Sequence, residues 1–197
     1  MEITAAMVKQ LRDQTGTGIM DCKDALKETE GDMTKALEFL RKKGLAKAQK
    51  RAGRATSQGV IQSYIHPGEQ IGVLVEVNCE TDFVAKTDDF KSFVRNMAMH
   101  IAATDPIGIS EEDIPDAVKE HEMEIYRAQA RELGKPDKVA DKIAEGKLKK
   151  FFKESCLLNQ QYVKDPDLTI QDLLNELVGK TGENITIRRY VRYQIGV

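Results

Sequence analysis

The sequence has little of what several classes of protein require. Its 197 residues include three cysteines and no tryptophan, and no apolar run approaches the length of a membrane span. The odd number and wide spacing of the cysteines argue against a disulfide framework, and no CxxC or HxxxH pair indicates a metal site. Because each cysteine lies among apolar neighbours, we expect buried, reduced thiols at Cys22, Cys79 and Cys156.

An excess of charge of one sign is also missing. The chain has 30 Lys and Arg against 32 Asp and Glu, a net charge of -2, which gives no global reason to expect nucleic acid or an anionic membrane. The start, MEITAAMV, carries an acid at Glu2 and no basic region before a hydrophobic stretch. We therefore expect a cytoplasmic protein that binds no membrane and no nucleic acid directly.

Residues 1–44 predict an N-terminal domain of three short helices. The first ends at the TGTG turn, Thr15 to Gly18, and the second ends at Gly31. The third begins after the N-cap residue Asp32 and ends at Gly44. Their apolar stripes are Ile3, Met7, Val8 and Leu11; Ile19, Cys22, Ala25 and Leu26; and Met33, Ala36, Leu37 and Leu40.

A basic stretch without any acid follows, and small residues between its charges favour a helix with little to pack against. We predict a linker helix over residues 45–56. An RNA-binding module is the alternative function that this stretch suggests, but no aromatic residue is interleaved for base stacking, so a solvated face is the preferred interpretation. The basic residues are Arg41, Lys42, Lys43, Lys47, Lys50, Arg51 and Arg54.

Residues 57–197 predict an α+β domain in which an antiparallel sheet packs with helices. Residues 59–79 form two strands joined by a Pro67-Gly68 turn. Helices are expected over Phe90 to Ile101, 117–133, 139–153 and from Ile170. The last strand, within residues 184–196, must find its partner in the distant hairpin, and such an order of strands and grouped helices is typical of the α+β class.

Signatures of catalysis fail when they are compared with the geometry that they need. Gly179, Lys180 and Thr181 resemble the end of a phosphate-binding loop, but its first glycine would fall at Leu174 and the stretch ends a helix. No histidine stands in a nucleophile context, and His100 is expected in the core or at its boundary. We therefore expect a binding protein, not an enzyme, without a cofactor.

Packing leaves two apolar residues unexplained. Met20 points away from the stripe of its helix and suits a protein contact, although isolated surface methionines are common. Phe83 could extend the buried face of the preceding strand, and base rates favour that burial. The strand pattern lapses at Glu80 to Asp82, however, so an outward turn would make Phe83 and Val84 a two-residue apolar wedge with Asp82 as its polar flank.

Two specific stretches, LRDQTGTGIMDCKDAL at 11–26 and VEVNCETDFVAK at 75–86, resemble the bacterial elongation factor Ts family. The resemblance continues through AMHIA at 98–102, GKPDKVADKIAEGKLKKFF at 134–152 and TGENITIRR at 181–189. It implies an N-terminal domain like the ubiquitin-associated domain, a linker helix and an α+β core. It also implies a guanine-nucleotide exchange factor that releases GDP from elongation factor Tu in translation, without covalent chemistry.

The resemblance further implies which residues contact the partner. Thr81, Asp82, Phe83 and Val84 would enter the G domain of elongation factor Tu, where Asp82 and Phe83 disturb the helices beside the nucleotide and dislodge Mg2+. The N-terminal domain would contact the same G domain through residues that match the family's pattern there, Met20 and Lys23. Further matching residues are His66, Gly182, Glu183 and Asn184.

The chain is similar to the short form of the family, with one core repeat and without the coiled-coil insertion of longer members. Longer members combine the TDF turn of one repeat with a histidine and a GEN loop of the other. Since the short form has one repeat, two chains are expected to rebuild one surface. The resemblance thus implies a homodimer that binds two partner molecules.

Overall fold

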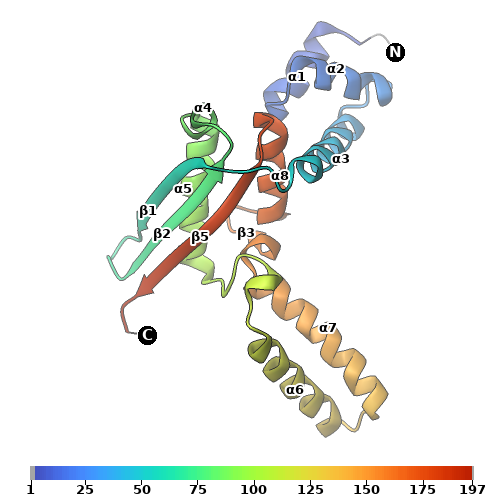
Figure 1. Ribbon diagram of the computed structural model, residues 1–197. Helices are drawn as coiled ribbons and strands as arrows, with labels where there is room; N and C mark the ends of the chain where they lie inside the picture. The colour runs from blue at the N-terminus through green and yellow to red at the C-terminus, as the bar shows by residue number, and fades with distance from the viewer. Residues whose placement is uncertain (1–2, 197) are drawn as a thin grey trace. The chain divides into compact units, whose positions relative to one another are not determined.

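A computed structural model describes residues 3–196, so Glu2 lies outside the described residues. The chain divides into two compact units, whose elements Figure 1 labels. The first unit contains the residues up to Gln62 together with Val75–Asn96 and Asp172–Arg188, and the second contains Ser63–Leu74, Met97–Gln171 and the residues from Arg189 onward.

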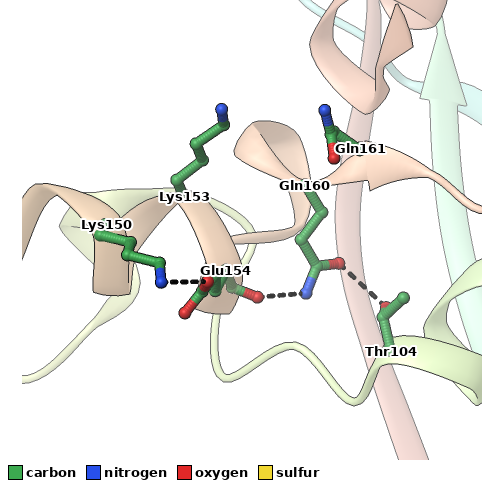
Figure 2. Close-up of a pocket in the computed structure, with 6 residues that line it drawn as sticks. All are labelled: Thr104, Lys150, Lys153, Glu154, Gln160 and Gln161. Atoms are coloured by element: carbon green, nitrogen blue, oxygen red, sulfur yellow. Dashed lines mark hydrogen bonds and ion pairs between the residues drawn. The ribbon is translucent and has the colours of Figure 1, made fainter. Parts of the chain in front are cut away.

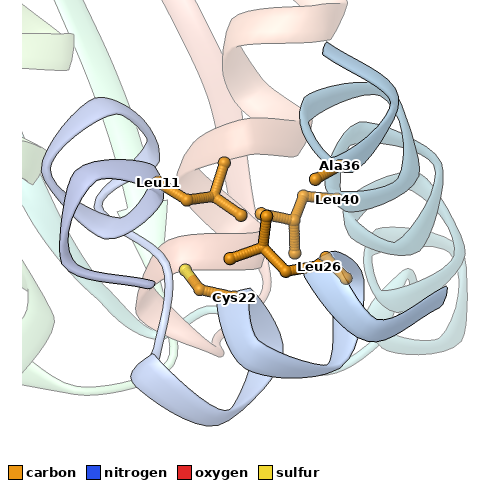
Figure 3. Close-up of a cluster of buried hydrophobic side chains, with 6 residues drawn as sticks. Leu11, Cys22, Leu26, Ala36 and Leu40 are labelled. Carbon is orange, nitrogen blue, oxygen red and sulfur yellow. The ribbon is translucent and has the colours of Figure 1, made fainter. Parts of the chain in front are cut away.

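Three helices at the N-terminal end of the chain enclose a small apolar core, as predicted. They are α1 (Ala5–Thr15), α2 (Ile19–Glu28) and α3 (Met33–Arg51). The side chain of Asp32 accepts a hydrogen bond from the backbone N–H of Lys35 and so caps α3. Figure 3 shows side chains from all three helices meeting in this core, whose buried members are Leu11, Cys22, Ala25, Leu26, Ala36 and Leu40.

Two predicted core residues and one predicted helix end are wrong. Ile19 and Leu37 are exposed, because short helices bury only a narrow stripe and these two side chains lie at its edge. Helix α3 passes Gly44 and ends at Arg51. Glycine inside a helix costs about 1 kcal/mol. Helix α3 lies close to α8 (Ile170–Thr181) at this point, since a Cβ on Gly179 of α8 would lie 3.4 Å from the Cα of Gly44.

Helix α3 therefore crosses the boundary expected at residue 44, and residues 45–51 of the expected linker continue its helix. The division into domains at 44 and 56 stays a prediction.

The main sheet has three antiparallel strands in the order β1-β2-β5. They are β1 (Gln58–Ile65), β2 (Ile71–Cys79) and β5 (Ile185–Gln194), so the last strand does pair with the distant hairpin. Gly68 has a φ of +95° in the turn between β1 and β2, a conformation that glycine adopts at little cost. Alternate residues of β2 are buried, and α5 (Asp88–Thr104) is the next long helix along the chain.

Helices α6 (Asp116–Glu132) and α7 (Asp137–Ser155) run side by side as an antiparallel hairpin (Figure 1). Ala130 of α6 is buried, as are Ala140 and Ala144 of α7, and these small side chains let the two helices approach closely. Two ion pairs join the helices, Arg127 to Asp141 at 2.7 Å and Arg131 to Asp137 at 2.9 Å. The two helices predicted over residues 117–133 and 139–153 are thus confirmed.

Short elements complete the second unit and confirm the α+β class. They are the 3-10 turns η1 (Glu111–Asp113) and η2 (Leu157–Asn159) and the antiparallel pair β3 (Gln161–Tyr162) and β4 (Asp165–Thr169). None of the helices within residues 3–196 combines the length and the apolar composition that a membrane crossing requires.

Candidate functional site

The TDFV segment forms a one-turn helix directly after the sheet. Strand β2 ends at Cys79, and α4 (Asp82–Ala85) begins three residues later, a turn that the sequence pattern had not predicted as helix. Thr81 is its N-cap, since its hydroxyl accepts a hydrogen bond from the backbone N–H of Val84 at 3.4 Å. The cap converts an extended strand into a helical turn within three residues.

Phe83 stands on this turn with its side chain in solvent. It is 79% exposed, whereas Val84 is 9% exposed and belongs to the core. Burial of Phe83, which base rates favour, is therefore wrong. The two-residue wedge is wrong too, because successive residues of a helix point about 100° apart and cannot share one exposed face. The apolar projection consists of Phe83 alone.

Asp82 flanks Phe83 and carries its charge at the surface. Lys86 donates a hydrogen bond to its carboxylate at 2.6 Å, and the Asp82 side chain is half-exposed. The hydrogen bond from Lys86 lowers the pKa of Asp82, so the carboxylate is ionised at neutral pH. The turn therefore presents one aromatic ring beside one negative charge.

The GEN loop of this chain, Gly182 to Asn184, meets the TDFV turn, Thr81 to Val84, within the same chain. Glu183 accepts two hydrogen bonds from Thr81, from the backbone N–H at 3.0 Å and from the hydroxyl at 2.6 Å. The backbone N–H of Asn184 donates to the carboxylate of Glu80 at 2.6 Å. A second chain is thus not needed to bring these two segments together.

The residues around this junction are buried or half-buried, and several hydrogen bonds hold them together. Asn184 is buried, and its side chain donates to the backbone carbonyl of Arg54 at 2.8 Å. The buried thiol of Cys79 donates to the carbonyl of Thr81, and burial, followed by the charge of Glu183, raises the pKa of Cys79. This cysteine is a structural thiol, as predicted. Gly182 has a φ of +78° and ends α8 with a hydrogen bond to the carbonyl of Val178.

Sequence reasoning missed the role of Glu80, which binds the GEN loop, and of Arg54, which lies 3.6 Å from Glu80. The available signal was an acid at the end of a buried strand, because charged residues in such places are usually paired.

Met20 and Lys23 lie on the exposed side of α2. Met20 is 66% exposed and Lys23 is also exposed, and Ile19 adds a third exposed side chain to this face. The prediction that Met20 points away from the helical core is confirmed. These side chains form an exposed face of their own in the first unit.

His66 follows β1 in the second unit. Its backbone N–H closes the hairpin by donating to the carbonyl of Ile71 at 2.9 Å. Its ring Nδ1 lies 3.1 Å from the hydroxyl of Tyr64, and the side chain is exposed. The His66 ring is accessible.

The basic stretch is largely engaged in ion pairs inside the first unit. Arg41 lies 2.9 Å from Asp172, and Lys43 and Lys47 lie 2.9 and 2.7 Å from Asp21. Hydrogen bonds from Lys47 and Lys43 lower the pKa of Asp21. Because paired cations attract phosphate less strongly, this arrangement speaks against an RNA-binding surface.

A pocket in the second unit is lined by Thr104, Lys150, Lys153, Glu154, Gln160 and Gln161. Its lining side chains bind one another, with Lys150 3.6 Å from Glu154 and Thr104 donating to the side-chain oxygen of Gln160 (Figure 2). No group of histidine, cysteine and acidic residues within residues 3–196 is arranged to hold a metal ion.

Comparison with known proteins identifies what the chain resembles as a whole. The sequence model of the family described as "Elongation factor TS" matches residues 23–197. The chain is 62% identical over 194 residues to the elongation factor Ts of Desulfosudis oleivorans, with 98% of each chain covered. It is 61% identical over 196 residues to that of Syntrophobacter fumaroxidans, covering 100% of this chain and 98% of the relative. For Carboxydothermus hydrogenoformans the identity is 60% over 194 residues, covering 98% and 89%.

Proposed function

The chain belongs to the elongation factor Ts family, and we propose that it is a cytoplasmic guanine-nucleotide exchange factor for elongation factor Tu. It binds the complex of elongation factor Tu with GDP, dislodges Mg2+ from that complex and promotes GDP release, so that GTP can bind. No covalent step and no cofactor of its own are required.

The observation that carries this proposal is the exposure of Phe83. An aromatic ring that is 79% exposed adds nothing to the core of its own chain, yet it offers a large apolar area for burial in a partner. The backbone below it is capped by Thr81 and anchored by the buried Val84. Phe83 is therefore presented with little freedom to lose on binding, as a protein anchor requires.

Asp82 supplies the electrostatic part of the proposed mechanism. Its ionised carboxylate lies next to Phe83 in sequence, so it enters the G domain with the ring. A negative charge near the nucleotide competes with the phosphates for Mg2+, whose double charge helps to hold them. Loss of that ion weakens the hold on GDP.

Binding free energy sets the number of contacts that are needed. An exchange factor binds the nucleotide-free partner more tightly than the nucleotide-bound one, and the nucleotide discriminates between the two by the same factor. A 10⁴-fold preference corresponds to about 5.5 kcal/mol, whereas burying one Phe contributes about 1.5–3 kcal/mol. We assign the remainder to the loss of Mg2+ and to the exposed face of α2 with Met20 and Lys23, which serves as the docking surface of the N-terminal domain.

We also propose a homodimer that binds two partner molecules, with His66 near the partner. The support is a set of exposed apolar side chains in the second unit, on the strands of the main sheet and just beyond them. Groups of exposed apolar side chains are typical of interaction surfaces. A second copy of the chain that packs on this surface would remove these side chains from water. They are Ile65, Leu74, Val191, Tyr193 and Ile195.

A GDP-release assay with purified elongation factor Tu tests the proposed function. Phe83→Ala is expected to slow stimulated release by about 10- to 100-fold, the equivalent of the apolar area lost. Its free energy of unfolding should stay within about 0.5 kcal/mol of wild type, because the ring is exposed. Leu133→Ala, which removes another exposed apolar side chain, is the control and should leave both quantities unchanged. Wild-type release rates in Phe83→Ala would refute the mechanism.

A further inference from the structure

Glu183 is bound to its own chain through both carboxylate oxygens. Oε2 accepts the backbone N–H of Thr81 and Oε1 accepts the Thr81 hydroxyl, at 3.0 and 2.6 Å. Hydrogen bonds to an ionised carboxylate are stronger than those between neutral groups. A second bond joins the same two segments in the opposite direction: the backbone N–H of Asn184 donates to the carboxylate of Glu80 at 2.6 Å.

Thr81 passes this restraint on to α4. The same hydroxyl that donates to Glu183 accepts from the N–H of Val84, and the carbonyl of Thr81 accepts from the N–H of Ala85 at 3.3 Å. A helix of four residues cannot hold itself, because its first turn is unfavourable to form. Its geometry therefore depends on its anchors, which are the Thr81 cap at one end and the burial of Val84 and Ala85.

Phe83 depends on that backbone for its position. With most of its ring in solvent, it has little side-chain packing to fix it, so the direction of α4 sets where the ring points. A ring that must enter a partner is sensitive to small changes in its position, since a misplacement of about 1 Å can cost about 100-fold in rate.

We propose that Glu183 is a positioning residue, which acts on the partner through Thr81 and Phe83 and does not itself contact elongation factor Tu. This inference rests on the proposed function of Phe83. It assigns to Glu183 a role different from the direct contact that the family resemblance implies for the GEN loop.

A double-mutant cycle separates the two roles. Glu183→Ala is expected to slow stimulated GDP release by about tenfold, as loss of a hydrogen bond to a charged group implies. In the Phe83→Ala background the same change should cause no further loss, because there is no ring left to position. If the double variant instead lost rate by the product of the two single losses, Glu183 would act independently of Phe83, by direct contact with the partner, and the inference would be overturned.

Amide hydrogen exchange in the isolated protein provides a readout that does not depend on the partner. Glu183→Ala should accelerate exchange at the amides of Thr81, Val84 and Ala85 while the core amides of β2 keep their protection. Unchanged exchange at all three amides would show that Glu183 does not order the turn. If Phe83→Ala proves harmless in the release assay, the proposed function fails, while the exchange data still decide whether Glu183 holds α4.

Three further variants guard against a folding artefact. Thr81→Ser keeps the hydroxyl and is the conservative variant that should restore release, whereas Thr81→Val loses both the bond to Glu183 and the cap of α4 and should be impaired at least as much as Glu183→Ala. Glu124→Ala removes an exposed glutamate from α6 and should change neither exchange nor release. If Thr81→Ser were as impaired as Glu183→Ala, the two hydrogen bonds would not explain the effect.

Discussion

His100 and Gln160 form a buried hydrogen bond, with Nε2 of the imidazole 3.0 Å from the side-chain oxygen of Gln160. The backbone N–H of Val163 donates to the other ring nitrogen, Nδ1, at 3.4 Å. Since Nδ1 accepts, the single proton lies on Nε2, and the ring is neutral. Burial lowers the pKa of His100 below its usual 6.5. The core histidine expected from the sequence is thus a satisfied member of a polar network.

This network makes stability dependent on pH. Below pH 6.5 the unfolded chain protonates His100 while the folded chain resists it, so the contribution is complete above that pH and is lost as the pH falls. The expected loss approaches about 1.4 kcal/mol per pH unit. His100→Gln keeps a donor toward Gln160 but has no titrating group, so its free energy of unfolding should fall less between pH 7 and pH 5. Urea unfolding at several pH values measures the difference.

His121→Gln is the matched control, because it removes an exposed histidine. It should keep the pH dependence of the wild-type protein. Equal slopes for wild type and His100→Gln would show that the core histidine does not contribute.

Gly59 lies against the backbone of the neighbouring strand. A Cβ at this position would be 2.3 Å from the carbonyl oxygen of Val77 and 2.8 Å from the Cα of Asn78. Backbone atoms cannot move aside as a flexible side chain can, so Gly59→Ala should force β1 away from β2. We expect a loss of about 1–3 kcal/mol in the free energy of unfolding, measured by urea denaturation.

Gly146→Ala on α7 provides the comparison for this substitution. An added Cβ there meets nothing within 4 Å, and alanine suits a helix better than glycine, so a gain of about 0.5–1 kcal/mol is expected. Similar effects of the two substitutions would contradict the close approach of Gly59 to β2.

Most elements of the fold could be predicted from the sequence, because the patterns that indicate them are local. Apolar stripes placed Leu11, Leu26 and Leu40 in one core, and period-two alternation placed Val75 and Val77 in a buried strand. The end of α3 could not be predicted, because glycine commonly ends a helix, whereas Gly44 lies inside α3 at a close contact with Gly179 of α8. That contact joins segments far apart in the chain, which no local pattern records.

The exposure of Phe83 was left open for the same reason. Continued alternation would place it on the buried side with Val75 and Val77. What decides its direction is the Thr81 cap and the carboxylate of Glu183, which lies 102 residues further along the chain. The partner of this cap comes from a distant part of the chain, so the local pattern allowed both directions for the ring but could not decide between them.

Asp82 offers a test of the electrostatic part of the mechanism. Asp82→Asn keeps the shape of the side chain and removes its charge, and the urea midpoint should barely change because exposed ion pairs contribute little. If the carboxylate helps to dislodge Mg2+, stimulated GDP release should fall by about tenfold. The assay should be run at low and high Mg2+, because a variant that displaces the ion poorly should lose most where Mg2+ is abundant.

Lys86→Met distinguishes the carboxylate from the ion pair. It removes the cation that lies 2.6 Å from Asp82 but leaves the negative charge free to act on the partner, so release should stay near the wild-type rate. Were Lys86→Met as slow as Asp82→Asn, the pair would serve to shape α4, and the charge itself would have no part in expelling the ion. Were Asp82→Asn unimpaired at every Mg2+ concentration, the ring of Phe83 would have to act without a charged neighbour.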